Sequence, residues 1–103
     1  LKKAYLSFKK AVSLLDRMSI KQKFFISPLS GEPYFFLANL FYYHIGKNNN
    51  KKEIESYLIS QKLYQSAKKL YFYDKNGELF YNLGRIYYIQ NDYHSALVEW
   101  TSL

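Results

Sequence analysis

The feature that most constrains the fold is an order of large and small side chains that occurs twice in the chain. "YFFLANLFYY" at residues 34–43 and "FYNLGRIYYI" at residues 80–89 can be laid on one another without a gap. The matched pairs are Tyr34 with Phe80, Leu37 with Leu83, Ala38 with Gly84, and Phe41 with Tyr87. Matched positions lie three or four residues apart, which is the spacing along one face of an α-helix. The sequence therefore predicts two copies of one helical unit.

A second pattern occurs in the segments around these two. Each example has a small residue, then an aromatic residue, then a third residue three further on: Ala4-Phe8-Ala11, Ser60-Tyr64-Ala67 and Ala96-Trp100-Leu103. This spacing is again helical. The alternation predicts an all-α chain of five helices, at residues 1–15, from 31–33 to about 45, from 50 to about 72, from 78 to Asn91-Asp92, and from there to the end.

The expected helix ends have recognisable signals. Pro33 is tolerated in a first helical turn, and Gly46 is favoured just past a helix end. Asn50 with Glu53 three residues on has the spacing of a helix cap, and Asp74 to Gly77, "DKNG", is typical of a turn. Residues 19–30 break the helical pattern, and their apolar residues 24–26 predict a loop that packs back on the domain.

Composition limits the class of protein. At 103 residues the chain has room for one domain, and 49% hydrophobic and 20% aromatic residues exclude intrinsic disorder. The longest apolar run, 34–43, is well short of the roughly 20 residues that span a membrane, so it predicts a buried helix. Without cysteine there is no disulfide, thiolate nucleophile or cysteine zinc site. Because the sequence begins at Leu1 directly in a helical pattern, we expect it to be a fragment of a longer protein.

One stretch carries a family resemblance. Phe80, Leu83, Gly84 and Tyr87, followed by Ala96 and Trp100, have the spacing of the tetratricopeptide repeat (TPR), a helix-turn-helix of about 34 residues. The resemblance implies a TPR-like α-solenoid of about five antiparallel helices with right-handed superhelical stacking. Gly84 and Ala96 are then small because the paired helices of one repeat approach most closely there. The expected core comprises Tyr34, Leu37, Ala38, Phe41, Tyr64, Ala67, Phe80, Leu83, Gly84, Tyr87, Ala96 and Trp100.

The resemblance divides residues 1–103, taken as a single domain, into three parts. Residues 1–18 correspond to the second helix of a half repeat, 31–74 to an irregular repeat, and 77–103 to a well-matched repeat. The first two parts depart from the family pattern through extra residues at 19–30 and around 45–55, "IGKNNNKKEIE". Asp16 and Phe72 also stand where the family has its closing proline. We therefore expect an irregular array.

The resemblance also implies a function and a site. In this family the first helices of successive repeats line a groove that holds a peptide or helix of a partner protein. The groove positions would be Phe35, Asn39 and Tyr42 on one helix, and Tyr81, Arg85 and Tyr88 on another, with Asn82 close by. An alternative stays open, in which residues 24–26 or a neighbouring repeat cover Phe35 and Tyr42. Phe35 also stands where the family's carboxylate clamp has its first lysine, which argues against such a clamp.

Residues that could carry chemistry are few. His44 and His94 fall on different helices, and neither has a second ligand at metal-binding spacing. No phosphate-binding glycine loop and no nucleophile motif is found. We therefore expect no enzyme, with no catalytic residue, metal site or cofactor, and a scaffold for protein–protein interaction as the function.

The charge is uneven and supports a second hypothesis. Residues 1–23 carry seven Lys or Arg against one Asp, whereas residues 77–103 carry one Arg against three acids, within a net charge of +7. The basic N-terminal end could attach to an anionic membrane surface or to nucleic acid, or could simply be a solvated helix face. Nucleic acid is not favoured, because helix packing accounts for the aromatic residues, and a membrane would be reached only through this end or through parts of a parent chain. A cytoplasmic and a bacterial periplasmic or cell-envelope location both stay open.

Overall fold

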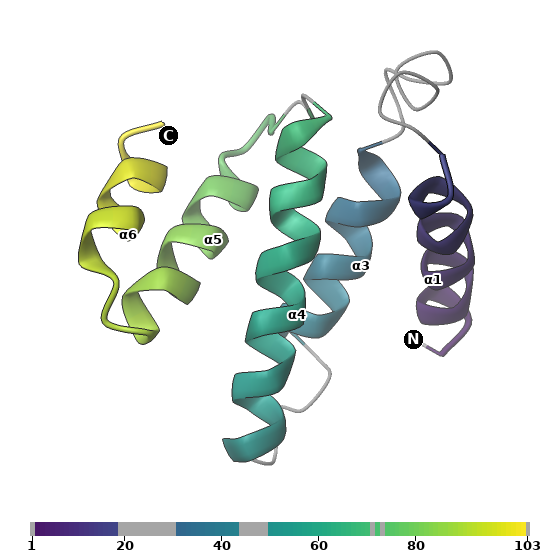
Figure 1. The fold of residues 1–103 in the computed structure, drawn as a ribbon, viewed down its shortest axis with the longest axis horizontal. Coiled ribbons are helices and arrows are strands. Elements are labelled where there is room, and N and C mark those ends of the chain that lie inside the picture. The colour runs from purple at the N-terminus through teal and green to yellow at the C-terminus, as the bar shows by residue number, and fades with distance from the viewer. Residues whose placement is uncertain (1, 19–30, 44–49, 71, 73, 103) are drawn as a thin grey trace. The chain divides into compact units, whose positions relative to one another are not determined.

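The computed structural model describes residues 2–18, 31–43, 50–70, 72 and 74–102, with backbone alone for 50–53. Within these residues the chain is all-helical and contains no strand, which confirms the predicted class and the five helices. The helices are α1 (Lys2–Asp16), α3 (Glu32–Tyr43), α4 (Asn50–Lys69), α5 (Glu78–Ile89) and α6 (Tyr93–Trp100) (Figure 1). Their contacts divide the chain into two compact units, residues 1–72 and 73–103, which we describe separately.

In the first unit, α3 and α4 form an antiparallel pair (Figure 1). Both helices of the pair contribute fully buried side chains, among them Tyr34, Leu37 and Ala38 of α3 and Tyr64 and Ala67 of α4. The helices approach closely because small residues lie at the contact. The Ser60 hydroxyl donates a hydrogen bond to the carbonyl oxygen of Ala38 at 2.8 Å.

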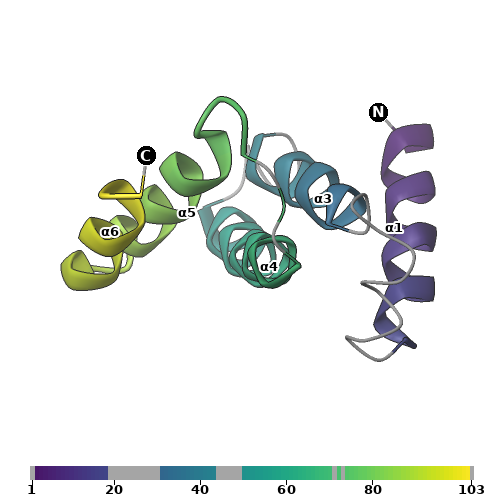
Figure 2. The same cartoon turned by 90° about the horizontal axis from the view of Figure 1, so that it is seen from above.

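Helix α1 packs on α3 through aromatic side chains. The rings of Phe8 and Phe36 stack with their centroids 5.4 Å apart, and Tyr5 meets Phe41 edge-on. The Tyr34 hydroxyl donates a hydrogen bond to the Asp16 carboxylate at the end of α1. In Figure 2 the length of α1 lies in the view while α3 and α4 are seen nearly end-on, so α1 crosses α3 obliquely.

The end of α4 falls before the predicted end near Phe72. The Leu70 N–H donates to the carbonyl oxygens of Ser66 and Ala67, and the Phe72 N–H also donates to Ala67, at 3.1 Å. These bonds satisfy helix-end carbonyls by turning the chain. A Cβ added to Gly31, before the start of α3, would lie 3.1 Å from Cβ of Phe72, so a larger residue would fit there only if Phe72 shifted by a few tenths of an ångström.

In the second unit, α5 and α6 form an antiparallel hairpin whose ends follow turn signals in the sequence (Figure 1). The Asp74 carboxylate accepts hydrogen bonds from the backbone N–H groups of Leu79 and Phe80, each at 3.0 Å, and so caps α5. Gly77 makes the turn at a φ of 72°, a conformation that glycine adopts without steric cost. The "DKNG" segment is thus the turn that was predicted.

The connection between α5 and α6 contains Asn91 and Asp92, each with a separate role. Asn91 has a φ of 63°, and its N–H donates to Tyr88 while that of Asp92 donates to Tyr87, which is the Schellman arrangement at a helix end. The Asp92 carboxylate then accepts a hydrogen bond from the Ser95 N–H at 3.2 Å and caps α6. Two residues therefore end one helix and begin the next.

The close contact within this hairpin explains Gly84. A Cβ added there would lie 2.4 Å from Nε1 of Trp100 and 2.6 Å from its Cδ1, distances too short for any side chain. Ala96 is buried on the facing helix. The prediction that Gly84 is small because the helices pair is confirmed.

Most of the expected core is buried. Fully buried are Tyr34, Leu37, Ala38, Tyr64, Ala67, Leu83, Gly84 and Ala96, and half-buried are Phe41, Phe80, Tyr87 and Trp100. Other expectations fall outside the described residues or side chains: the loop at 19–30, His44, the helix end near 45–46, and the cap of Asn50 with Glu53.

Candidate binding surface

The seven residues predicted to line a groove lie in both units. Phe35, Asn39 and Tyr42 are on α3 in the first unit. The other four, Tyr81, Asn82, Arg85 and Tyr88, are on α5 in the second. The environments of the two groups differ.

The three residues on α3 are engaged in the packing of the first unit. The Phe35 ring stacks on that of Phe72 with centroids 4.4 Å apart, and the Tyr42 ring lies 5.5 Å from that of Tyr57. Asn39 is half-buried and accepts a hydrogen bond from the Tyr64 hydroxyl.

Phe35 is consequently 6% exposed and Tyr42 9% exposed. Both side chains are thus covered, as in the open alternative; of the covers that it named, residues 24–26 lie outside the described residues. Among the described residues, the aromatic rings found beside them come from α3 and α4 and from Phe72.

Three of the four residues on α5 are exposed. Tyr81, Arg85 and Tyr88 are spaced by four and three residues, which places them along one side of the helix. Tyr81 and Tyr88 each expose 53% of their surface. Asn82 is only 2% exposed, so it belongs to the interior.

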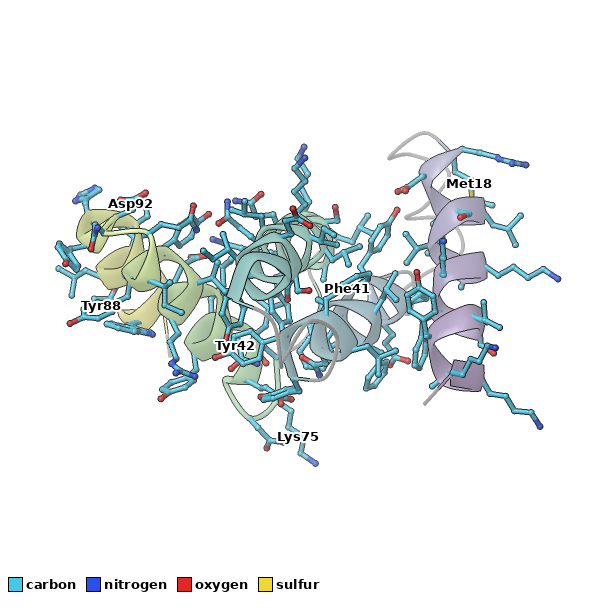
Figure 3. The ribbon with its side chains drawn as sticks, turned by 90° about the horizontal axis from the view of Figure 1, so that it is seen from below. Met18, Phe41, Tyr42, Lys75, Tyr88 and Asp92 are labelled. Atoms are coloured by element: carbon cyan, nitrogen blue, oxygen red, sulfur yellow. The ribbon has the colours of Figure 1, made fainter. Side chains whose placement is uncertain are left out.

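Helix α6 extends this exposed side with an aromatic residue that sequence reasoning missed. The Tyr93 ring lies 5.1 Å from that of Tyr88, edge to face, and Tyr93 is itself exposed. The half-buried Trp100 ring lies 5.9 Å from Tyr88, and its Nε1 donates a hydrogen bond to the Tyr81 carbonyl oxygen at 3.2 Å. Figure 3 places Tyr88 at the outer surface of the hairpin. The short connection at residues 90–92, which brings the end of α5 beside the start of α6, was the signal that could have located Tyr93.

We call these residues, Tyr81, Arg85, Tyr88, Tyr93 and Trp100, the hairpin surface. It offers aromatic area with one cation in its midst. Nearby, hydrogen bonds from Ser95 lower the pKa of Asp92, so that this carboxylate is ionised at neutral pH.

The structure also bears on other kinds of site. In the part of the chain that it describes, no group of three or more His, Asp or Glu side chains could hold a metal ion. His94 is exposed on α6. No helix among the described residues has the length and apolar character needed to cross a membrane.

Comparison of the chain with protein-family models, with curated proteins and with solved structures gives no match.

Proposed function

We propose that this chain is a scaffold for protein–protein interaction whose hairpin surface binds a segment of a partner protein. The observation that carries the proposal is the exposure of Tyr81, Arg85 and Tyr88 along one side of α5, continued by Tyr93 of α6. Tyrosine, tryptophan and arginine are the residues that most often dominate binding energy at protein interfaces.

The chemistry of the surface indicates what kind of segment would fit. Tyrosine rings supply rigid contact area for an apolar side chain, and a guanidinium has five donors that can hold a carboxylate or backbone carbonyls. We therefore propose as partner a peptide or helix with an aromatic or aliphatic anchor next to such an acceptor.

The proposal includes the TPR-like architecture. It is supported by two antiparallel helix pairs that each have small residues at their contact, Ala38 with Ser60 in one and Gly84 with Ala96 in the other. In this proposal the pairs are successive, irregular repeats of an α-solenoid with right-handed stacking. An experimental structure of the chain would test the stacking directly.

The test of function begins with a partner identified by pull-down, whose affinity is then measured by calorimetry. Arg85→Ala should weaken binding by about 2 kcal/mol or more, as the loss of an interface arginine does. Arg17→Ala is the matched control, because Arg17 is an exposed arginine directly after α1 in the other unit and its loss should leave the affinity unchanged.

A second set of variants distinguishes contact from general charge attraction. Replacing Lys2, Lys3, Lys9 and Lys10 with Gln should leave the affinity nearly unchanged, and binding should depend only weakly on salt. A large loss from the lysine set, combined with no effect of Arg85→Ala, would overturn the proposal.

A further inference from the structure

The outward side of α1 is strongly basic. The exposed cations of this helix and the residue after it are Lys2, Lys3, Lys9, Lys10 and Arg17. At about 100° per residue they fall within one arc, opposite the buried Val12 and Leu15. In Figure 3, long side chains with nitrogen tips extend from α1 away from α3.

Negative charge is scarce on this arc. Asp16 is the one acid of α1 and lies at the edge of the arc, where it accepts the hydrogen bond of the Tyr34 hydroxyl. At the same edge, Nζ of Lys9 lies 5.5 Å from the centre of the Tyr5 ring, so this ammonium group gains a cation–π contact without losing its charge. The arc can therefore attract an anionic surface with all five cations.

Two apolar side chains lie among these cations. Leu6 and Leu14 each expose 53% of their surface, although the same helix buries Val12 and Leu15 against its own unit. Leu6 lies near the middle of the arc, three residues after Lys3 and four before Lys10. A binding partner that only neutralised the positive charge would leave the side chains of Leu6 and Leu14 exposed to water.

Only one of the anionic partners considered above satisfies both features. Nucleic acid would neutralise the cations through its phosphates but offers no apolar phase for the leucines. A bilayer with anionic headgroups attracts lysines and accepts apolar side chains at the boundary between headgroups and acyl chains. We propose that the outward side of α1 is a docking surface for an anionic phospholipid membrane, on which α1 lies in the plane with Leu6 and Leu14 inserted.

This inference does not depend on the proposed function, because it uses α1 in the first unit and not the hairpin surface. Each cation near an anionic membrane contributes roughly five-fold in affinity, so the arc supports reversible rather than permanent attachment. Five cations and two leucines would give clear binding to vesicles with anionic lipid and little to neutral ones.

The experiment is co-sedimentation of the full chain with two kinds of vesicle, phosphatidylcholine alone and phosphatidylcholine with about 30% phosphatidylserine. The chain should bind the anionic vesicles, and binding should fall as salt is raised from about 0.1 M to 0.5 M. Replacing Lys2, Lys3, Lys9 and Lys10 with Gln should weaken binding by about 100-fold or more. The matched control replaces the exposed Lys62, Lys68, Lys69 and Lys75, which removes the same charge elsewhere and should have a much smaller effect.

The leucines separate the membrane from other anionic partners. Leu6→Ser with Leu14→Ser leaves the charge unchanged and should weaken vesicle binding roughly ten-fold, while binding to a DNA duplex should be unaffected. Far-UV circular dichroism should show each variant folded, since every substituted side chain is exposed. Equal loss from both lysine sets would show attraction by net charge alone and overturn the proposal. Unchanged vesicle binding by the leucine variant would also overturn the proposal. The same holds if the chain does not bind vesicles and the α1 lysines instead control its self-association.

Discussion

Gly84→Ala is the substitution whose outcome follows most directly from the structure. The added Cβ would lie 2.4, 2.6 and 2.9 Å from Nε1, Cδ1 and Cε2 of Trp100, whereas non-bonded heavy atoms prefer about 3.5–4.0 Å. The indole must therefore move by roughly 1 Å. Because its Nε1 donates to the Tyr81 carbonyl oxygen, that movement also breaks the hydrogen bond that joins the two helices.

Opposing terms decide the magnitude. Alanine in place of glycine inside a helix stabilises it by about 1 kcal/mol. Overpacking costs about 1–3 kcal/mol, and loss of a hydrogen bond costs about 0.5–1.5 kcal/mol. We therefore expect Gly84→Ala to lower the free energy of unfolding by about 1–3 kcal/mol, and Gly84→Leu to lower it further.

A double-mutant cycle with Trp100→Ala removes the clash and should reverse the sign. Trp100 is half-buried, so its loss alone should cost about 2 kcal/mol, less than a fully buried tryptophan. In that background Gly84→Ala should stabilise the chain by up to about 1 kcal/mol. Urea unfolding followed by far-UV circular dichroism measures the unmodified chain and the three variants, and hydrogen exchange of α5 and α6 amides reports on this unit alone. Stabilisation by Gly84→Ala in the unmodified chain, or an equal effect in both backgrounds, would refute the packing argument.

Three further predictions concern single contacts. Asn91→Ala should cost about 1 kcal/mol in urea unfolding because of the φ of 63°, whereas Asn91→Gly should be neutral or slightly stabilising; equal effects would contradict the assigned conformation. Ser60→Ala should cost about 1 kcal/mol, since the carbonyl oxygen of Ala38 loses its donor, and an unchanged midpoint would show that water replaces it. Burial, together with the hydrogen bond to Asp16, raises the pKa of Tyr34, so its protonated form is favoured in the folded state. Stability should then fall above about pH 10 by up to 1.4 kcal/mol per pH unit, and Tyr34→Phe should lack this component.

The helices could be predicted because their signals are local. Periodic apolar residues give each helix, and short polar segments with special backbone preferences end it. Gly77 and Asn91, for example, adopt positive φ values at the turns where the sequence placed them. The end of α4 was predicted too late because Leu70 and Phe72 continue the apolar spacing, while hydrogen bonds to Ala67 turn the backbone. Apolar spacing does not distinguish a last helical turn from a chain that folds back.

The exposure of the candidate site depends on contacts between helices, and the spacing of residues along a single helix does not specify these contacts. Phe35 and Tyr42 have the same helical spacing as Tyr81 and Tyr88, yet the first two are buried and the last two are exposed. The difference comes from the partner helix, whose length and aromatic residues are set elsewhere in the chain. The family resemblance alone, which assigned Phe35 and Tyr42 to a groove, therefore could not show that these side chains are buried.

The two helix pairs show how one pattern gives one closed and one open surface. Helix α4 has 20 residues, and its Tyr57 and Tyr64 lie beside Tyr42, while the chain that follows brings Phe72 onto Phe35. Helix α6 has only eight residues. Its residue matched to Tyr64 is Trp100, which lies against Gly84, bonds to the backbone of Tyr81, and leaves more than half of the Tyr81 and Tyr88 surface exposed.

The residue opposite the aromatic ring also differs between the two pairs. Because Gly84 has no side chain, the Trp100 ring lies close enough to α5 for its Nε1 to donate to the Tyr81 carbonyl oxygen. The side chains of Tyr81 and Tyr88 keep over half of their surface exposed. In the first unit Ala38 occupies the matched position, and the Tyr64 hydroxyl reaches the Asn39 side chain instead. Gly84 thus determines both how closely the helices pair and where Trp100 lies, and Gly84→Ala, by displacing Trp100, should disturb the partner binding proposed for the hairpin surface as well as stability.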